Sequence, residues 1–406
     1  MNGACTIVSP NYLPFARTLA QSFMQHHPDH AFFVLIVANL HDATVFQDEP
    51  FNVVLMTDIS LPDIKCLAMK YDILELNTNV KPTFMKHLLK RFELETLVYL
   101  DPDIRVYNTL SPIFEMLQSA NVVLTPHLTS PLPEDGHIPC ERDMLYNGTY
   151  NLGFIAVKQS PETARMLDWW EARCLREGFS EGRSGLFVDQ KWINLVPGLF
   201  EGIGICRDLG CNMAYWNLNE RSLTRNDAGI LVNESAPLRF FHFSGIEIDD
   251  PAMLSKNTDR FTLADRPDLA SLFADYKAKI IKNRRSVRDG ISYGFDTYSD
   301  GSAVTRLQRR IFAAHEADFG HQDPFDIRNR FYDFAQRHGL LIRQRKVVKS
   351  TWREFNPEDR RVRLVNGLLL IVLRLLGSAR YELLMRYLSF ISILRNQAVF
   401  IRDPRP

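Results

Sequence analysis

The stretch Leu97-Val98-Tyr99-Leu100-Asp101-Pro102-Asp103-Ile104-Arg105-Val106-Tyr107 decides how the rest of this chain is interpreted. Its first four residues are apolar and predict a buried strand that runs directly into two acids one residue apart. The carboxyl end of a strand is where open α/β sheets bind ligands. Because neighbouring carboxylates repel each other, a fold that keeps Asp101 and Asp103 together usually gives them a cation. The alternative is an ordinary strand-terminal turn, since Asp-Pro-Asp suits turns well.

Strand and helix patterns alternate along the first part of the chain. Residues 4–9 and 31–38 predict strands, and a helix over 82–92 leads into the strand that ends before Asp101. A continuous apolar run such as 31–38 is typical of a parallel strand covered on both faces. This alternation predicts a doubly wound α/β domain with a mainly parallel sheet over residues 1–262.

The charge of the chain is divided between its two ends. Residues 1–275 carry 22 basic and 35 acidic side chains, whereas residues 276–406 carry 26 and 13, so a formal net charge of zero hides the asymmetry. Helical periodicity with frequent arginine predicts a basic, mainly helical region over 263–406. The apolar stretches 365–376 and 381–394 look too short and too interrupted to span a bilayer. They form either the core of a helical subdomain or a surface that lies on an anionic membrane.

The cysteines and the N-terminus indicate where the protein works. The six cysteines show no Cys-x-x-Cys pair and no framework spacing, which favours free thiols in a reducing compartment. The first residues lack a basic segment followed by an apolar one, so no signal peptide is expected. We therefore expect a cytoplasmic protein, peripheral on the inner face of the membrane if the tail binds lipid, and no nucleic-acid partner.

Four short motifs accompany the acidic turn. They are Thr6-Ile7-Val8-Ser9-Pro10-Asn11-Tyr12, Tyr150-Asn151-Leu152-Gly153-Phe154, Phe187-Val188-Asp189-Gln190-Lys191-Trp192-Ile193-Asn194 and Phe240-Phe241-His242-Phe243-Ser244-Gly245. Tyr12 can stack on a flat heterocycle, and Asn11 can bond a ribose hydroxyl. Other interpretations stay open, since Asp189 stands where a helix N-cap would, and His242 alternates with aromatic residues as a core histidine does.

In this order, the motifs resemble those of GT-A glycosyltransferases, and more narrowly the retaining family that includes glycogenin and bacterial lipopolysaccharide galactosyltransferases. The resemblance implies a Rossmann-like GT-A catalytic domain with a C-terminal helical extension. It also implies that Asp101, Asp103 and His242 hold Mn²⁺ or Mg²⁺ on the diphosphate of a nucleotide sugar, with a UDP-sugar favoured as donor.

The same resemblance implies the remaining site residues. Asp189, Gln190 and Asn151 would frame the donor sugar as the catalytic residues. The residues implied for the nucleotide and its phosphates are Ser9, Asn11, Tyr12, Lys81 (with Lys86 in reserve), Gly153 and Gly245. The lysine that the family often carries after its His-x-x-Gly segment is absent, so Lys256 or Arg260 would close over the β-phosphate.

The expected function is metal-dependent transfer of a hexosyl unit from a nucleotide sugar to a glycan or lipid-linked glycan. The resemblance implies retention of anomeric configuration and a place in bacterial surface-polysaccharide assembly. One alternative is an inverting GT-A enzyme that uses Asp189 or Glu247 as general base. Another is a non-catalytic scaffold protein that binds nucleotide sugars.

Overall fold

The structure is a computed structural model, and it describes residues 1–227, 229–284, 291–319, 322–342 and 359–403. Contacts divide the chain into two compact units: Met1–Leu67 with Ile73–Gly294, and Ala68–Asp72 with Phe295–Pro406. This division lies later in the chain than the boundary expected at 262/263. The reason is that α10 (Pro267–Arg284) packs against α1 (Leu13–His26) within the first unit.

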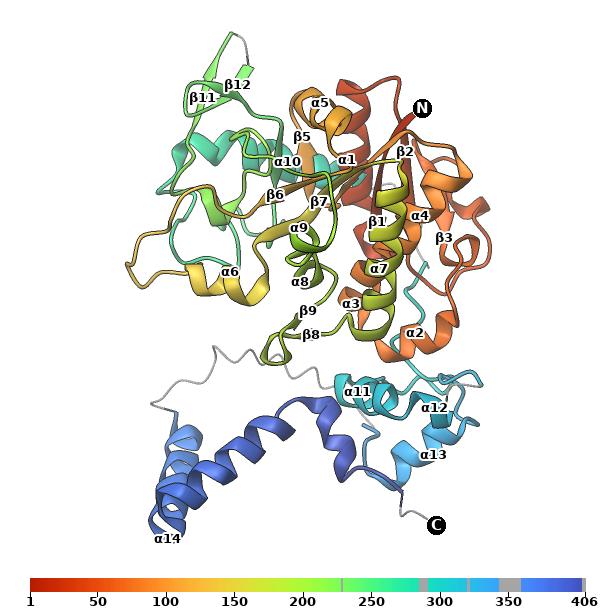
Figure 1. Ribbon diagram of the computed structural model, residues 1–406, viewed down its shortest axis with the longest axis vertical. Helices are drawn as coiled ribbons and strands as arrows, with labels where there is room; N and C mark the ends of the chain where they lie inside the picture. Colours follow the sequence, from red (N-terminus) through yellow and green to blue (C-terminus); the bar gives the residue numbers. More distant parts are fainter. Residues whose placement is uncertain (228, 285–290, 320–321, 343–358, 404–406) are drawn as a thin grey trace. The chain divides into compact units, whose positions relative to one another are not determined.

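A seven-stranded sheet forms the centre of the first unit, in the order β10-β6-β7-β4-β1-β2-β3 (Figure 1). The β7 strand is antiparallel to both of its neighbours, and the other four pairs of neighbouring strands are parallel. The doubly wound α/β class with a mainly parallel sheet is therefore confirmed. The strands are β1 (Asn2–Val8), β2 (Ala31–Ile36), β3 (Asn52–Leu55), β4 (Thr96–Leu100), β6 (Val122–Pro126), β7 (Tyr150–Lys158) and β10 (Ile203–Ile205).

Helices cover both faces of this sheet (Figure 1). On one face, α1 and α5 (Ser111–Ser119) contribute to an apolar cluster that includes Val98 and Leu100 of β4. On the other face, the first residue of α4 (Lys81–Arg91) lies over the ring of Tyr99, and α4 packs against α7 (Pro161–Glu177). Because side chains alternate along a strand, β4 is buried on both faces, which explains its continuous apolar run.

The remaining elements before Gly294 are short. The helical ones are η1 (Pro10–Tyr12), η2 (Thr44–Phe46), η3 (Met56–Asp58), α2 (Ile64–Lys70), α3 (Ile73–Asn79), α6 (Glu141–Asn147), η4 (Gly182–Ser184), α8 (Gln190–Ile193), α9 (Val196–Leu199) and η5 (Tyr215–Asn217). The strands are β5 (Ile104–Val106), β8 (Ser180–Glu181), β9 (Leu186–Phe187), β11 (Leu223–Asn226), β12 (Gly229–Val232), β13 (Ala236–Pro237) and β14 (Phe240–His242).

One of these short pairings positions the candidate site. The β5 strand follows β4 after the acidic turn, and it pairs antiparallel with β14 so that Ile104 lies opposite His242. The pairing continues past the strand end, because the Phe243 N–H donates to the Asp103 carbonyl at 2.9 Å. Two segments that are far apart in sequence are thereby fixed side by side at the carboxyl end of β4.

The described part of the second unit is mainly helical from Arg306 onwards, which confirms the predicted C-terminal helical extension. Aromatic side chains form its core, with the rings of Phe312 and Phe331 5.1 Å apart and Phe334 fully buried beside them. Its elements are α11 (Arg306–Ala314), α12 (Glu316–Phe319), α13 (Arg330–Arg337), α14 (Arg360–Ile391) and η7 (Leu394–Val399).

The apolar stretches of the tail lie in α14 and the start of η7. None of the residues of α14 is buried, so these stretches do not form the core of the described part of the second unit. The alternative of a surface that lies on a membrane stays a prediction. Among the described helices, α14 alone is long and apolar enough, by length and composition, to cross a membrane. This finding differs from the expectation that the stretches are too short, although Gly377 interrupts the helix with non-helical backbone angles.

A buried histidine links the end of α1 to the start of α5. His27 packs between the rings of Phe23 and Phe114, and its Nε2 accepts a hydrogen bond from the Leu110 N–H at 3.0 Å. Burial, together with the neighbouring His30 and His26, lowers the pKa of His27 from 6.5 to about 4. The folded protein therefore holds this imidazole in its neutral form.

We predict that His27 makes the folded protein sensitive to acid. The unfolded chain binds this proton at pH 6.5, whereas the folded protein resists it down to about pH 4. Above pH 6.5 the imidazole is neutral in both states, and His27 costs no stability. As the pH falls from 6.5 towards 4, protonation of the unfolded chain lowers the free energy of unfolding by about 3 kcal/mol at most. Urea unfolding at pH 7 and pH 5 should show a smaller loss of stability for His27→Gln than for wild type. An identical loss in both proteins would contradict this assignment.

Candidate functional site

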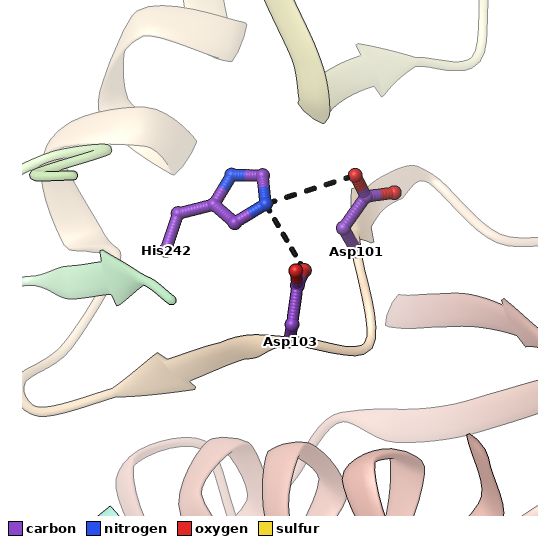
Figure 2. Close-up of side chains that lie close together, drawn as sticks. All are labelled: Asp101, Asp103 and His242. Atoms are coloured by element: carbon purple, nitrogen blue, oxygen red, sulfur yellow. Dashed lines mark ion pairs between the residues drawn. The ribbon is translucent and has the colours of Figure 1, made fainter. Parts of the chain in front are cut away.

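The two acids of the turn and the histidine of β14 form one cluster (Figure 2). The His242 Nε2 lies 3.0 Å from an Asp103 carboxylate oxygen and 3.9 Å from an Asp101 oxygen. One ligand atom from each of the three residues lies within 4.8 Å of the others. These residues could therefore hold a metal ion, and hard carboxylate oxygens with one imidazole suit Mn²⁺ or Mg²⁺.

The charges of this cluster are strongly coupled. Burial disfavours a charged His242, but the carboxylates of Asp103 and Asp101 outweigh burial and raise the pKa of His242. Burial raises the pKa of Asp101, and Asp103 adds to the effect, whereas Lys81 and His242 oppose it. In this conformation, a proton on the imidazole reduces the repulsion between the two carboxylates. A cation bound between the acids would reduce that repulsion in the same way.

Tyr99 orients one of the acids. Its hydroxyl donates to Asp101 Oδ1 at 2.7 Å, which leaves Oδ2 directed at the histidine. The Asp101 N–H donates to the Gly153 carbonyl of β7 at 2.7 Å, so both the backbone and the side chain of this acid are fixed. Tyr99 was not predicted as a site residue. Its position two residues before Asp101 could have indicated this role, because residues two apart along a strand lie on the same face.

Asn151 lies behind the histidine. With the proton on Nδ1, the His242 ring donates to Asn151 Oδ1 at 3.2 Å and presents Nε2 to the acids. Asn151 Nδ2 lies 3.3 Å from the Nε2 of His127, and burial lowers the pKa of His127 to about 4, so that ring is a neutral acceptor. The structure therefore places Asn151 as a partner of His242, the candidate metal ligand, and such contacts fix the tautomer and the orientation of a ligating ring.

Asn212 completes this arrangement and was missed in the sequence. It is fully buried, and its Nδ2 donates to Asn151 Oδ1 at 3.2 Å and to Thr125 Oγ1 at 3.0 Å. Its backbone is left-handed, with φ of 56°, a conformation that asparagine tolerates better than most residues. No motif in the sequence marks this residue, because its role depends on contacts with β6 and β7.

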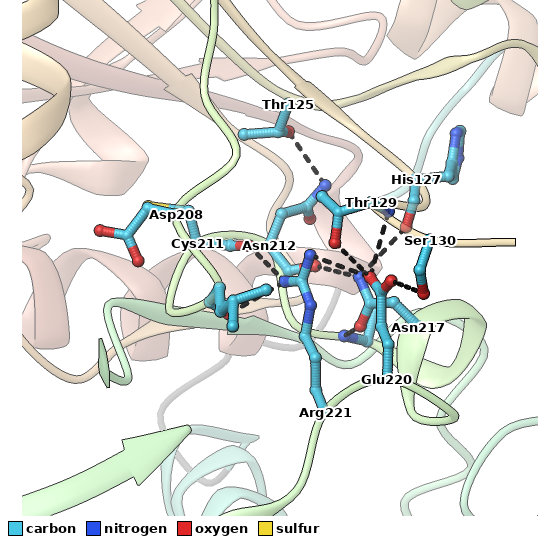
Figure 3. Close-up of polar contacts among 12 residues, drawn as sticks. Thr125, His127, Thr129, Ser130, Asp208, Cys211, Asn212, Asn217, Glu220 and Arg221 are labelled. Atoms are coloured by element: carbon cyan, nitrogen blue, oxygen red, sulfur yellow. Dashed lines mark hydrogen bonds and ion pairs between the residues drawn. The ribbon is translucent and has the colours of Figure 1, made fainter. Parts of the chain in front are cut away.

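The segment around Asn212 is itself held by polar contacts (Figure 3). Asn217 Nδ2 donates to the carbonyls of Asn212 and His127, at 3.0 and 3.2 Å. Glu220 accepts a hydrogen bond from the Thr129 hydroxyl at 2.8 Å. The loop that follows β6 is thereby tied to residues 212–220, and this bracing keeps the amides behind His242 in place.

The structure explains why the two predicted site glycines, Gly153 and Gly245, are glycine. A Cβ at Gly153 would collide with the His242 ring, so only glycine allows β7 to pass this close to the histidine. Gly245 has φ of 73°, and a Cβ there would lie 2.6 Å from both Ser255 Oγ and Asn257 Nδ2. Both glycines therefore shape the backbone around His242, which immediately precedes the turn at Gly245.

Lys81 and Asp189 form a buried ion pair. The Lys81 Nζ lies 2.6 Å from Asp189 Oδ2, donates to the Leu152 carbonyl at 2.7 Å, and sits 4.1 Å from the centre of the Tyr99 ring. Burial raises the pKa of Asp189, and Lys81 opposes that effect. Asp189 precedes α8 but its side chain makes no capping hydrogen bond, so helix capping does not explain this residue.

Gln190 braces the same segment. Its Oε1 accepts from the Leu152 N–H at 2.9 Å, and its Nε2 donates to the Asn147 carbonyl at 3.1 Å. Asp189, Gln190 and Lys81 therefore converge on the backbone of residues 151–153. In the described conformation all three side chains are buried.

The residues predicted to contact the nucleotide lie at the end of β1. Ser9 is buried and its hydroxyl donates to Asn11 Oδ1 at 2.8 Å. Tyr12 stacks on Phe15 and remains 42% exposed, which leaves the phenol ring accessible. Burial raises the pKa of Tyr12, with contributions from Asp103, Glu247 and Asp101, so the ring lies within electrostatic reach of the acidic cluster.

Three further basic residues were proposed to contact the phosphates, and each of them lies near an acidic side chain. Lys86 pairs with Asp168 and Glu171 of α7, each at 2.6 Å. Arg260 pairs with Asp135 and donates to the Pro139 carbonyl at 3.1 Å. Lys256 is exposed and lies 3.8 Å from Glu247, which leaves it the most accessible of the three.

The chain matches no protein family by sequence profile. It is 28% identical over 287 residues to the uncharacterized protein YfnF of Bacillus subtilis (strain 168), covering 70% of this chain and 94% of YfnF. It is 24% identical over 307 residues to the uncharacterized protein YfnD of the same organism, covering 73% of this chain and 93% of YfnD.

Among solved structures, the chain is similar to the galactosyltransferase LgtC in complex with donor and acceptor sugar analogs. The TM-score is 0.40 at 14% identity, over 68% of this chain and 95% of LgtC. For the glycosyltransferase GlyE of Streptococcus pneumoniae TIGR4 the TM-score is 0.39 at 14% identity, over 71% and 65%. For the bifunctional WbbM it is 0.38 at 13%, over 70% and 52%. This similarity to GT-A glycosyltransferases concerns the fold alone.

We predict that Asn212 supports metal binding through Asn151 and His242. Asn212→Gly removes the amide and suits the left-handed backbone, and we expect it to weaken Mn²⁺ binding about 10- to 100-fold, as losses of such supporting contacts do. Titration of free Mn²⁺ by electron paramagnetic resonance measures this affinity. Asn233→Gly is the matched control, because Asn233 is also left-handed, with φ of 50°, but lies on a surface turn. Unchanged affinity in Asn212→Gly would show that Asn151 needs no such support.

Proposed function

We propose that the protein is a divalent-metal-dependent glycosyltransferase that moves a hexosyl unit from a nucleotide sugar, with a UDP-sugar favoured, to a glycan or lipid-linked glycan. The observation that carries the proposal is the cluster of Asp101, Asp103 and His242 at the carboxyl end of a central strand. This edge of an open α/β sheet is where ligands bind. When bound there, Mn²⁺ or Mg²⁺ supplies positive charge to the diphosphate leaving group.

The surrounding side chains support a donor site beside this cluster. The exposed ring of Tyr12 offers a stacking surface for the base, and Asn11 is oriented by Ser9 to bond the ribose or the base edge. Lys256 is the accessible cation for the β-phosphate. These residues bind and orient the nucleotide, while Tyr99 and Asn151 hold the metal ligands in position.

Asp189 and Gln190 are proposed to act at the donor sugar. Their contacts with Lys81 and with Leu152 fix the backbone that follows Asn151, which is the segment assigned to the sugar. Direct contact between the Asp189 carboxylate and a sugar hydroxyl requires this buried residue to become accessible when the donor binds. We further propose that the reaction retains configuration and serves bacterial surface-polysaccharide assembly in the cytoplasm.

Loss of one acid should remove metal-dependent binding. We predict that Asp103→Ala weakens Mn²⁺-dependent binding of UDP at least a hundredfold, because the ion loses a charged ligand that lies 3.0 Å from its histidine partner. Calorimetry with and without Mn²⁺ measures the effect, and Glu115→Ala, at an exposed position on α5, is the control. Equal Mn²⁺-dependent affinity in Asp103→Ala would remove the basis of the proposal. Binding without any hydrolysis of nucleotide sugars would instead favour the scaffold alternative.

The stereochemical outcome separates the retaining from the inverting alternative. We predict retention, and proton NMR of the first-formed product determines the anomeric configuration directly. Inversion would require a general base with access to the acceptor. Glu247 meets that condition better than Asp189, because its side chain is 51% exposed whereas Asp189 is buried against Lys81. A product of inverted configuration would therefore direct attention to Glu247→Gln.

A further inference from the structure

The helix α14 has an apolar surface that no described part of its own unit covers. An 18-residue window of this helix has a mean hydropathy of 1.7, and none of that window is buried. Leu364, Leu368, Ile371, Leu375 and Leu383 are each between 52% and 78% exposed. Soluble proteins rarely expose a continuous apolar surface of this kind unless it binds a partner or a membrane.

A break divides α14 into two arms. Gly377 has φ of 73° and ψ of 163°, so the helix bends sharply there and its arms point in different directions (Figure 1). At 1.5 Å per residue, the arms 360–376 and 378–391 are roughly 25 and 21 Å long. Neither reaches across a hydrocarbon core of about 30 Å. Although the helix as a whole is long enough to cross a membrane, its shape does not provide a straight span.

The charges on α14 are almost all positive, and every positive charge is an arginine. Its sequence holds six arginines, one glutamate and no lysine. The glutamate, Glu382, is paired with Arg386 at 2.5 Å, so arginine dominates the polar surface. Guanidinium groups bind phosphate in a bidentate manner and are only weakly hydrated, which suits the headgroup layer of a membrane. This pattern complements an anionic lipid surface.

The second arm is amphipathic. Ser378, Glu382, Arg386 and Ser389 recur at helical spacing and share one face. Tyr387 and Ile391 lie on the other face, which also carries Arg380 near the start of the arm. The first arm is apolar on nearly all sides between Leu364 and Leu376 apart from Asn366, Gly367 and Arg374. An apolar arm joined to an amphipathic one is suited to a membrane interface, where one side contacts acyl chains and the other contacts headgroups.

The C-terminal end of α14 is tied to the folded core of its unit. Asn396 Nδ2 and Gln397 Nε2 of η7 donate to the Phe390 and Ile391 carbonyls, at 2.9 and 3.1 Å. Further along, Asp403 pairs with Arg337 of α13 at 2.8 Å. Whatever α14 binds is therefore linked through ordered contacts to the helical core of α11 and α13.

We propose that α14 is a monotopic membrane anchor that lies within one leaflet of an anionic lipid bilayer and does not cross it. Its apolar arms insert among the acyl chains, the bend at Gly377 keeps both arms in the same leaflet, and the arginines bind lipid phosphates. The proposal concerns the second unit and does not depend on the glycosyltransferase chemistry proposed above. It differs from binding by charge alone, because the inserted leucines hold the protein when salt screens the arginines.

Vesicle binding of the full chain tests the proposal. We expect the protein to sediment with vesicles of phosphatidylcholine and phosphatidylglycerol, to bind pure phosphatidylcholine at least tenfold more weakly, and to remain largely bound in 1 M NaCl. The triple variant Leu368→Ser, Ile371→Ser, Leu375→Ser should bind at least tenfold more weakly. Leu74→Ser on α3 is the matched control, since Leu74 is 58% exposed in the first unit. Wild-type binding by the triple variant, no binding by the full chain, or complete release by salt would overturn the proposal.

Labels on α14 distinguish insertion from the other ways of covering it. In a Cys140→Ser background, a spin label at Leu368→Cys should be reached by oxygen, and one at Ser389→Cys by a water-soluble nickel complex. A thiol at Ser392→Cys should stay reactive towards an impermeant reagent added outside the vesicles. Protection of that thiol would mean that the helix crosses the bilayer. Association of the lipid-free chain that shields both labels and persists with vesicles would mean that a second copy covers α14.

Discussion

The antiparallel pairing of β5 with β14 is the contact on which the candidate site depends. It places His242 opposite Ile104 and therefore beside the acidic turn, and it is continued by the hydrogen bond from Phe243 to Asp103. Without this pairing, Asp101 and Asp103 would be two repelling carboxylates at the end of a strand. With it, an imidazole lies 3.0 Å from one of them, and the three side chains form a preorganised set of candidate metal ligands. The sheet supplies rigidity, because β4 is paired on both edges and buried on both faces.

Buried polar groups around this set are costly unless they are satisfied. Two networks of contacts pair most of them, although Asn212 Oδ1 has no hydrogen-bond partner among the described residues. One runs from Asp189 through Lys81, over the ring of Tyr99, to Asp101. The other runs from Thr125 through Asn212 and Asn151 to His242. Removing one partner of a buried ion pair such as Lys81–Asp189 typically costs about 3–5 kcal/mol, because the other charge stays buried. These networks make the geometry of the acids and the histidine a property of the fold, so it does not rely on single flexible side chains.

The two units use their apolar residues in opposite ways. In the first, apolar side chains fill both faces of the sheet, and the exposed ring of Tyr12 stands at the carboxyl end of its strands. In the second, aromatic residues of α11 and α13 form a small core, while the leucines of α14 face outwards. The division of charge follows the same two units, since the arginine-rich helix belongs to the unit with the exposed apolar surface. The two proposals, a glycosyltransferase site in the first unit and a lipid-binding helix in the second, would together suit an acceptor that is itself carried on a lipid.

The sequence by itself determined the fold class and the strand end at which the two acids lie, because apolar periodicity and the acids after Leu100 are local signals. It also drew attention to His242 and Gly153, which the structure brings close together, and to Gly245, whose φ is positive. The functional roles of these three residues stay predictions. Only the tertiary structure decided that Lys81 pairs with Asp189, that Asn151 turns towards His242, and that Asn212 supports it. It likewise showed that α14 is exposed within the described part of its unit. The sequence cannot indicate this, because covered and exposed apolar helices can have the same composition. Contacts between residues distant in the chain leave no periodic trace in the sequence, and burial depends on what the whole chain packs against.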